Sequence, residues 1–350
     1  MKKVAIVGTV GIPACYGGFE SLVENLTKYK SNNIDYTVFC SSGSYKEKLE
    51  SHNGARLIYI PINANGVQSI PYDIFSLLKA LFLKPDVILI LGVSGCIFLP
   101  FIRFFSNSKI VTNIDGLEWK REKWSTLAKR FLKFSEMVAV KFSHVVVTDN
   151  KGIGDYVFDE YGIETTTIAY GGDHAFTGRK TLTSQEKYAL ALCRIEPENN
   201  VKMILDAYAI SGRYLKFIGN WDSSEYGKLL KKEFSSYSNI DIIDPIYDVS
   251  RLEEIRAGCT IYLHGHSAGG TNPSLVEMMH FSVPILAFDC NFNRYTTNNK
   301  ALYFSSSSHL NEVILSASDE TFSDISTNMK SLADSLYVWS EISSRYESLY

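Results

Sequence analysis

The residues with the clearest chemical potential lie in the segment IYLHGHSAGGTNPSLVEMM, from Ile261 to Met279. An apolar run ends at two histidines, small residues follow, and an apolar stretch then carries Glu277. This order predicts a buried strand, a tight loop and the start of a helix, where unpaired backbone N–H groups can bind an anion. Glu277, about one turn into that helix, can accept two hydroxyl groups. A phosphate and a vicinal diol together are the outline of a nucleotide-sugar.

The two histidines of this segment, His264 and His266, would face the same way on a continued strand. Two histidines with no third ligand nearby make a poor zinc site. We therefore expect no metal here, and a hydrogen bond from one histidine to a sugar hydroxyl or a phosphate instead.

A second glycine-rich segment, GTVGIPACYGGFE, spans Gly8–Glu20 and follows the first predicted strand. Glycines let the backbone approach a ligand closely, and Gly17 and Gly18 precede the helix that carries Glu20. The segment lacks the G-x-G-x-x-G spacing of a dinucleotide-binding turn. Two interpretations remain, contact with a ligand lodged between two domains and a glycine-rich connection without a ligand.

Paired carboxylates, Asp115 and Glu118, follow the predicted strand Ile110–Ile114, at the end of a strand where α/β proteins bind their ligands. They could carry out acid–base chemistry or hold sugar hydroxyls, although Asp115 could also simply cap a helix. The next helix interleaves cations with apolar side chains, as expected either at an anionic membrane surface or for core packing with a lysine rim. These residues are Trp119, Lys120, Arg121, Lys123, Trp124, Leu127, Lys129, Arg130, Phe131, Lys133, Phe134 and Lys141.

A single arginine, Arg194, follows the predicted strand Ala189–Cys193. At the end of a strand it could bind a pyrophosphate through both arms of its guanidinium group. The alternative is that Arg194 only pairs with Glu196 or Glu198.

Length and composition narrow the class of protein. A chain of 350 residues favours two domains, and a net charge of −3 gives no overall basic signature of nucleic-acid binding. The six cysteines form no C-x-x-C pair, which indicates buried thiols in a reducing compartment. The apolar run after Met1-Lys2-Lys3 is too short for a signal peptide. Residues 87–102 are uncharged but fall short of the ~20 residues that span a bilayer, so we expect a strand, a turn and a short helix there.

Short apolar runs alternate with amphipathic stretches along the whole chain, which predicts an α/β fold with doubly wound parallel sheets. The break at Thr165–Phe176 divides the runs into two Rossmann-like domains, residues 1–170 and 171–330, that face each other across a cleft. Residues 331–350 form a helix that could cross back to the first domain. The predicted strands are Val4–Gly8, Tyr36–Cys40, Leu57–Ile60, Val87–Leu91, Ile110–Ile114, Val145–Thr148, Thr166–Ala169, Ala189–Cys193, Leu215–Ile218, Ile240–Ile243, Thr260–Leu263 and Pro284–Phe288.

Three features together resemble glycosyltransferase family four, of GT-B fold, over essentially the whole chain. They are the Gly-Gly-Glu loop after the first strand, the Arg-x-x-Pro-Glu segment Arg194–Glu198, and the Glu277-bearing helix after a glycine-rich loop. The nearer resemblance is to a bacterial rhamnosyltransferase branch with a DUF1972-type N-terminal domain, through Gly8–Glu20, DGLEWKR at Asp115–Arg121 and GHSAGGTNPSL at Gly265–Leu275.

The resemblance implies a retaining glycosyltransferase that needs no metal or other cofactor. The donor would be dTDP-L-rhamnose, and the acceptor a saccharide on undecaprenyl-pyrophosphate in O-antigen or capsule assembly. Such an enzyme would be cytoplasmic and peripheral on the inner face of the cytoplasmic membrane, with no nucleic-acid partner.

The resemblance also assigns roles to residues. Arg194 would stabilise the departing diphosphate, Glu277 would hold the ribose, and Asp115 would stand near the acceptor hydroxyl, so these three form the catalytic set. The donor-binding residues would be Gly17, Gly18, Arg194, Asn199, Lys202, His266, Gly269, Gly270, Thr271, Asn272, Ser274, Leu275 and Glu277. The acceptor-binding residues would be Tyr16, Glu20, Asp115, Glu118, Trp119, Lys120 and Arg121.

Two positions depart from the family pattern. Asn199 stands where the family has a lysine, five residues after the arginine, and Lys202 is a candidate to replace it. Gly269 stands where the first glutamate of an E-x7-E pair would fall, so His266 or Asn272 would take over its sugar contact.

Other functions fit parts of the same pattern. They are a GT-B transferase with another donor, of the UDP-glucose or GDP-mannose type, a GT-B epimerase or phosphorylase, and a non-catalytic nucleotide-sugar-binding protein. A phosphorylase should carry a lysine for pyridoxal phosphate in the donor domain, and no candidate stands out.

Overall fold

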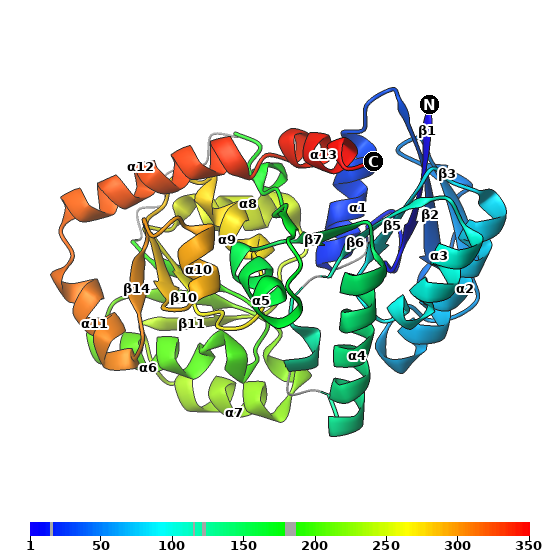
Figure 1. Ribbon diagram of the computed structural model, residues 1–350. Coiled ribbons are helices and arrows are strands. Elements are labelled where there is room, and N and C mark those ends of the chain that lie inside the picture. Colours follow the sequence, from blue (N-terminus) through cyan, green and yellow to red (C-terminus); the bar gives the residue numbers. More distant parts are fainter. Residues whose placement is uncertain (15–16, 115, 121–123, 179–186) are drawn as a thin grey trace. The chain divides into compact units, whose positions relative to one another are not determined.

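The computed structural model describes residues 1–14, 17–114, 116–120, 124–178 and 187–350 (Figure 1). The chain divides into two compact units. Unit 1 comprises Met1–Ala169 and Trp339–Tyr350, and unit 2 comprises Tyr170–Val338. Each unit has its own sheet, and every strand that the sequence predicts overlaps a strand of the structure. The predicted α/β class is thereby confirmed.

The sheet of unit 1 has the order β3-β4-β2-β1-β5-β6-β7-β8. All neighbours are parallel except β3 and β4. The strands are β1 (Lys2–Val7), β2 (Ile34–Ser41), β3 (Ser51–His52), β4 (Ala55–Ile60), β5 (Val87–Leu91), β6 (Lys109–Asn113), β7 (Val145–Thr148) and β8 (Thr166–Thr167). The strand order reverses between β1 and β5, both of which are central and, apart from Lys2 and Lys3, buried.

Helices cover both faces of this sheet. Because crossovers between parallel strands are right-handed, the reversal puts α1 on one face and α2 to α5 on the other. Consistent with this, α1 contacts α13, whereas α3 contacts both α2 and α4. The helices are α1 (Gly18–Lys28), α2 (Ser69–Leu83), α3 (Leu99–Phe105), α4 (Thr126–Phe142), α5 (Lys151–Tyr161) and α13 (Trp339–Ser348).

The sheet of unit 2 is parallel throughout, in the order β11-β10-β9-β12-β13-β14. Its order reverses between β9 and β12, which is the arrangement of a doubly wound nucleotide-binding domain. The strands are β9 (Ala189–Leu192), β10 (Leu215–Ile218), β11 (Ile240–Ile243), β12 (Ile261–His264), β13 (Ile285–Phe288) and β14 (Leu302–Phe304).

The helices of unit 2 also lie on both faces, with α6 and α7 on one side of the reversal and α8 to α10 on the other. On the first face, α6 packs against α11 over a core that includes Phe217 and Trp221. The helices are α6 (Val201–Ser211), α7 (Glu225–Phe234), α8 (Val249–Gly258), α9 (Pro273–Met279), α10 (Asn291–Thr296), α11 (Ser307–Ser316) and α12 (Asp319–Leu336).

The C-terminal segment differs from the single helix predicted over residues 331–350. Helix α12 ends at Leu336 in unit 2, and α13 belongs to unit 1. The break falls at Tyr337, which leaves the helical conformation while its hydroxyl donates to the Thr296 carbonyl at 2.7 Å. Within unit 1, the hydroxyls of Tyr36 and Tyr350 lie 3.0 Å apart, so α13 leads the end of the chain onto the sheet of that unit.

The uncharged stretch 87–102 forms β5, a turn and the start of α3, as the sequence predicts. Among the described residues, the structure contains no helix with the length and apolar character needed to cross a membrane.

Candidate functional site

The candidate site of unit 2 lies where the strand order reverses. Strands β9 and β12 are neighbours, with Ala191 paired to Leu263, so the loops at their carboxyl ends leave the sheet side by side. Ligands of open α/β sheets bind outside the carboxyl ends of the strands at such a reversal.

The two loops are joined by several hydrogen bonds. The Asn200 side chain donates to the Gly265 carbonyl at 2.8 Å, and the Ser267 N–H donates to the Glu198 carbonyl at 3.0 Å. Asn199, which is 2% exposed, receives a hydrogen bond from His266 Nδ1 at 2.7 Å and donates to the Arg194 carbonyl at 2.7 Å. The asparagine in the position of the expected lysine therefore holds together the loops that carry Arg194 and His266.

Arg194 itself projects from the loop with a side chain that is 46% exposed. Its guanidinium nitrogens lie 3.6 Å from Glu196 Oε1 and 3.9 Å from Glu198 Oε1. Exposed ion pairs at such distances stabilise a protein little. Arg194 therefore pairs with both glutamates, as the alternative interpretation of the sequence predicts. These ion pairs are weak enough for an anionic ligand to compete with them.

Helix α9 begins with Asn272 as its N-cap. The Asn272 side chain accepts a hydrogen bond from the Ser274 N–H at 3.0 Å and another from the Ser274 hydroxyl at 2.7 Å. One N–H at this helix start is thus already satisfied by the chain itself. Thr271 and Leu275, beside these residues, are buried. The other loop glycines predicted to bind the donor, Gly269 and Gly270, are half-buried.

Glu277, on α9, belongs to a charged cluster. One carboxylate oxygen is hydrogen-bonded to Arg256, whose side chain is only 8% exposed, and the other lies 3.4 Å from His174 Nε2. Burial by itself would raise the pKa of Glu277, but Arg256 and His174 outweigh it, and the pKa lies below its usual value. Glu277 therefore stays ionised, and an ionised carboxylate has enough lone pairs to accept hydroxyl groups as well.

His174 reaches this cluster because Gly172 lies directly against α9. A Cβ atom built at Gly172 would come within 2.6 Å of the Val276 backbone, so no larger residue fits without movement. Residues Asp173–Ala175 then form a short 3₁₀ helix that contacts α9.

Neither basic partner of Glu277, Arg256 or His174, was predicted from the sequence. For Arg256, the sequence offers no distinguishing signal, since the same helix also carries Arg251, Glu253 and Glu254. For His174, the available signal was the polar pair after Gly171-Gly172.

Two other predicted residues lie apart from this cluster. Lys202 points along the surface of α6, where its ammonium lies 2.9 Å from Asp206 and 3.0 Å from Glu233. His264 is buried, and its burial lowers the pKa well below the usual value, so it is neutral. The structure does not bring Lys202 to the loops at β9 and β12.

In unit 1, the loop after β1 is organised by glutamates. Glu20 is 7% exposed, and its Oε1 atom accepts from the Thr9 hydroxyl at 2.9 Å and from the Val10 N–H at 2.8 Å. A Cβ atom at Gly17 would meet Glu20 Oε2 at 1.9 Å, so Gly17, with a φ of 146°, is the residue that lets the carboxylate turn back. Gly18 opens α1. The predicted acceptor contact of Glu20 thus falls on a side chain that already binds its own loop.

The remaining acceptor-binding predictions fall around residues 118–120, which form a 3₁₀ helix. Glu118 Oε1 accepts from Trp124 Nε1 at 3.0 Å, and the Lys120 ammonium lies 5.3 Å from the centre of the Trp119 ring. The predictions on Tyr16, Asp115 and Arg121 lie outside the described residues.

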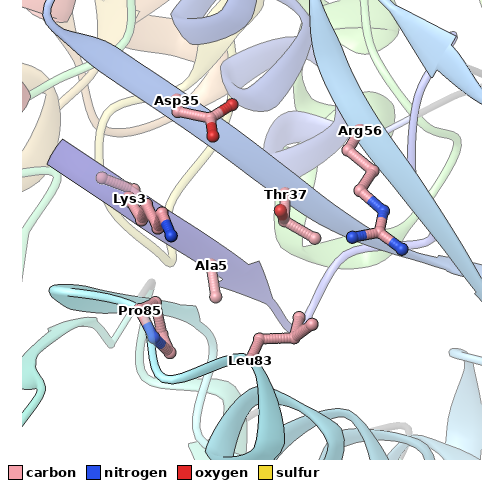
Figure 2. A pocket seen from close by; sticks show the side chains of 8 residues that line it. Lys3, Ala5, Asp35, Thr37, Arg56, Leu83 and Pro85 are labelled. Carbon is pink, nitrogen blue, oxygen red and sulfur yellow. The ribbon is translucent and has the colours of Figure 1, made fainter. Parts of the chain in front are cut away.

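A hollow in unit 1 is unrelated to these positions. Figure 2 shows Lys3, Asp35 and Arg56 among the side chains that line it. Each of these is the second residue of its strand, so the hollow lies near the amino ends of β1, β2 and β4. Its volume is about 210 Å³. Ligands of such sheets bind at the opposite, carboxyl edge. In the described part of the chain, no cluster of three or more His, Cys, Asp or Glu side chains has an arrangement that could hold a metal ion.

Comparison with solved structures identifies the fold. The sucrose-phosphate synthase of Thermosynechococcus elongatus superimposes with a TM-score of 0.81 at 14% sequence identity, over 100% of this chain and 98% of that one. HepE of Anabaena, determined in complex with UDP-glucose, gives 0.74 at 14% identity, over 100% and 99% of the two chains. The trehalose-6-phosphate synthase OtsA gives 0.75 at 10% identity, over 99% and 98%. The chain therefore has the GT-B fold, with two Rossmann-like domains.

The N-terminal part also matches a family model. Residues 1–173 match the domain of unknown function DUF1972, as the resemblance implied. No curated protein sequence matches the chain. Because the structural relatives share so little sequence and include a putative UDP-N-acetylglucosamine 2-epimerase from Listeria monocytogenes (TM-score 0.65, 11% identity, 99% and 95% coverage), they define the fold and not the reaction.

Proposed function

We propose that this chain is a glycosyltransferase that takes a sugar from a nucleoside-diphosphate sugar. The observation that carries the proposal is that the segments after the two strands at the reversal of unit 2 carry an exposed arginine, Arg194, and an ionised carboxylate, Glu277. Arg194 is half exposed and only loosely paired, and Glu277 is kept charged by Arg256 and His174.

Each of these groups has a distinct part in the proposed reaction. The Arg194 guanidinium would bind the diphosphate and stabilise the negative charge that grows on it as the sugar departs. The Glu277 carboxylate would accept hydrogen bonds from the ribose hydroxyls. His266 and the loop Gly269–Asn272 would contact the donor beside them, and Asn199 would keep both loops in register.

Structural relatives support a donor of this class. HepE was determined with UDP-glucose and, separately, with UDP and glucose, and MnaA of Staphylococcus aureus was determined with UDP. The last comparison has a TM-score of 0.64 at 14% identity, over 100% of this chain and 98% of that one.

The finer proposal rests on the sequence motifs. We propose dTDP-L-rhamnose as the donor, an undecaprenyl-pyrophosphate-linked saccharide as the acceptor, and retention of configuration without a metal. The acceptor residues would include Asp115, Glu118, Trp119 and Lys120 in unit 1. This activity would serve bacterial surface polysaccharide synthesis at the inner face of the cytoplasmic membrane.

Release of nucleoside diphosphate tests the proposed reaction. Purified protein is incubated with dTDP-rhamnose and a lipid-linked saccharide, and the product is measured for Arg194→Ala, Glu277→Gln and the control Arg213→Ala. Arg213 is an exposed arginine two residues before β10, at the amino ends of the strands. We expect Arg194→Ala to lose ~100-fold or more in kcat/KM, as for removal of a group that stabilises transition-state charge. We expect Glu277→Gln to lower kcat/KM through weaker donor binding, because the ribose hydroxyls lose a charged acceptor. Normal turnover in both would refute the site assignment.

The identity of the donor has its own test. A ligand that binds only the folded state raises the melting temperature, so dTDP-, UDP-, GDP- and ADP-sugars are compared by thermal shift. The rhamnose proposal predicts the largest shift with dTDP-rhamnose, and a larger shift with another donor would replace it.

An epimerase is the second candidate, favoured by the likeness to the putative Listeria epimerase. It would convert one nucleotide-sugar into another without an acceptor. Product analysis by NMR separates the two functions, since an epimerase changes the sugar and leaves the nucleotide attached.

A further inference from the structure

A second ligand-sized hollow lies in unit 1, along one side of α4. Its volume is about 620 Å³. The α4 residues that line it recur at helical spacing, and a single face of the helix therefore points into the hollow. The lining residues are Trp119, Lys120, Thr126, Lys129, Arg130, Lys133, Phe134, Met137, Glu160 and Tyr161.

The charge of the lining is strongly one-sided. Four cations face a single carboxylate, Glu160, which lies 3.0 Å from the Lys133 ammonium. Among the described residues, no carboxylate forms an ion pair with Lys129 or Arg130. At Lys129 and Arg130 the hollow therefore presents positive charge with no ion-paired carboxylate among the described residues, which favours an anionic ligand.

A buried carboxylate, Glu136, holds the aromatic side chains at the hollow in place through hydrogen bonds. Glu136, 2% exposed, accepts hydrogen bonds from Trp119 Nε1 at 3.0 Å, from the Tyr156 hydroxyl at 2.6 Å and from the Tyr161 hydroxyl at 2.7 Å. The Lys133 ammonium lies over the Trp119 ring, 4.8 Å from its centre. These contacts fix the aromatic wall and one cation before any ligand binds.

Apolar side chains continue from the hollow onto the surface of the same helices. Leu127 and Phe134 on α4 are 79% and 54% exposed, and Phe104 on the adjacent α3 is 82% exposed. The carboxylates of α2, α3 and α4 are Asp73 and Glu136, and both are buried. An exposed face with aromatic side chains, cations and no acid fits the interface of a lipid bilayer.

We propose that this hollow binds the phosphate or diphosphate end of a long-chain lipid, with Lys129 and Arg130 on the phosphate oxygens and the lipid chain along the exposed phenylalanines. Lys120 and Lys133 complete the cationic lining, and Trp119 forms the wall that excludes water. The choice of a diphosphate-linked lipid rests on the proposed function, whereas the anionic and amphipathic character of the ligand rests on the hollow itself.

The test measures binding without catalysis. The full chain is sedimented with phosphatidylcholine vesicles that contain a small fraction of either undecaprenyl diphosphate or undecaprenol. We expect binding only with the diphosphate, and about 30-fold weaker binding for the double variant Lys129→Ala/Arg130→Ala, since each cation beside a lipid phosphate contributes a factor of about five. The control Lys141→Ala removes a cation from the last turn of the same helix, outside the hollow, and should bind like the unsubstituted protein.

Three results would overturn the proposal. The first is equal binding to the undecaprenol vesicles. The second is an equal loss of binding in the Lys141→Ala control, which would indicate general attraction to a charged surface. The third is competition by inorganic diphosphate as strong as that by the lipid, which would mean that the hydrocarbon chain of the lipid makes no contact with the protein. Failure of the proposed function looks different, because vesicles would still bind while no sugar is transferred from any nucleotide-sugar.

Discussion

The buried contact between Arg256 and Glu277 makes a prediction whose size can be worked out from the structure. The side chains are 8% and 15% exposed, and the third member of the cluster, His174, is 35% exposed. The informative change is Arg256→Met, which keeps the volume and apolar stem of the arginine but removes its charge. It leaves the Glu277 carboxylate buried, with His174 Nε2 at 3.4 Å as its remaining basic partner.

Removing one partner of a buried ion pair costs about 3–5 kcal/mol, because the remaining charge has lost its compensation. The residual contact with His174 reduces this cost, so we expect ~2–4 kcal/mol of lost unfolding free energy at neutral pH. The double variant Arg256→Met/Glu277→Gln should recover most of the loss, since no buried charge remains.

The substitution Arg256→Met should also change how the free energy of unfolding depends on pH. In the unsubstituted protein the pKa of Glu277 lies below its usual value, so its contribution to stability is present above the unfolded pKa and is lost as pH falls through the folded pKa. In Arg256→Met, burial dominates and raises the pKa of Glu277. The contribution of this group to the stability of the variant should therefore decrease as pH rises, opposite to its contribution in the unsubstituted protein.

Urea unfolding from pH 4.5 to 8 measures both effects. Trp221 is buried in the core of unit 2, and the other tryptophans, Trp119, Trp124 and Trp339, are in unit 1. Fluorotryptophan labelling followed by fluorine NMR therefore separates the unfolding of unit 2 from that of unit 1. A loss under about 1 kcal/mol, the range of an exposed pair, combined with an unchanged pH slope, would refute the claim that this cluster is a buried, ionised one.

Three further substitutions have definite expected outcomes. Burial raises the pKa of Asp73 from 3.8 to about 8, although the Gly95 backbone hydrogen bond opposes this shift. The contribution of Asp73 to the stability of unit 1 should therefore fall as pH rises between these two values. In Asp73→Asn, the melting temperature should depend less on pH over this range. Gly172→Ala should cost ~1–3 kcal/mol in urea unfolding because its Cβ would meet the Val276 backbone, whereas Gly43→Ala, with open space around it, should cost little. Asn199→Ala should weaken donor binding in calorimetry, because the loops at β9 and β12 lose their shared side chain.

Runs of apolar residues were sufficient to predict most strands of both sheets. Parallel strands that are buried on both faces consist of nearly continuous hydrophobic residues, so they can be recognised in the sequence. Strands β3 and β14 were missed. Each is only two or three residues long at an edge of its sheet, and so short a segment has no periodicity to detect. The break between α12 and α13 was also missed, since it depends on contacts of Tyr337 with residues such as Thr296 that are distant in sequence.

The candidate site was predictable in part. Arg194 and Glu277 could be found because each follows a strand whose carboxyl end borders the reversal of the sheet. His174 and Arg256 could not be paired with Glu277, because they come from separate segments that only the folded unit brings to it. Asn199 was identified as a departure from a family pattern, but its contacts with His266 and with the Arg194 carbonyl depend on the neighbouring loop.

The most direct test of the central claim is a crystal structure of the chain with a bound nucleoside diphosphate. We expect the diphosphate within hydrogen-bonding distance of Arg194 and the ribose hydroxyls on Glu277, beside the loops that follow β9 and β12. A nucleotide bound elsewhere, for example at the amino ends of the strands, with Arg194 and Glu277 untouched, would contradict it.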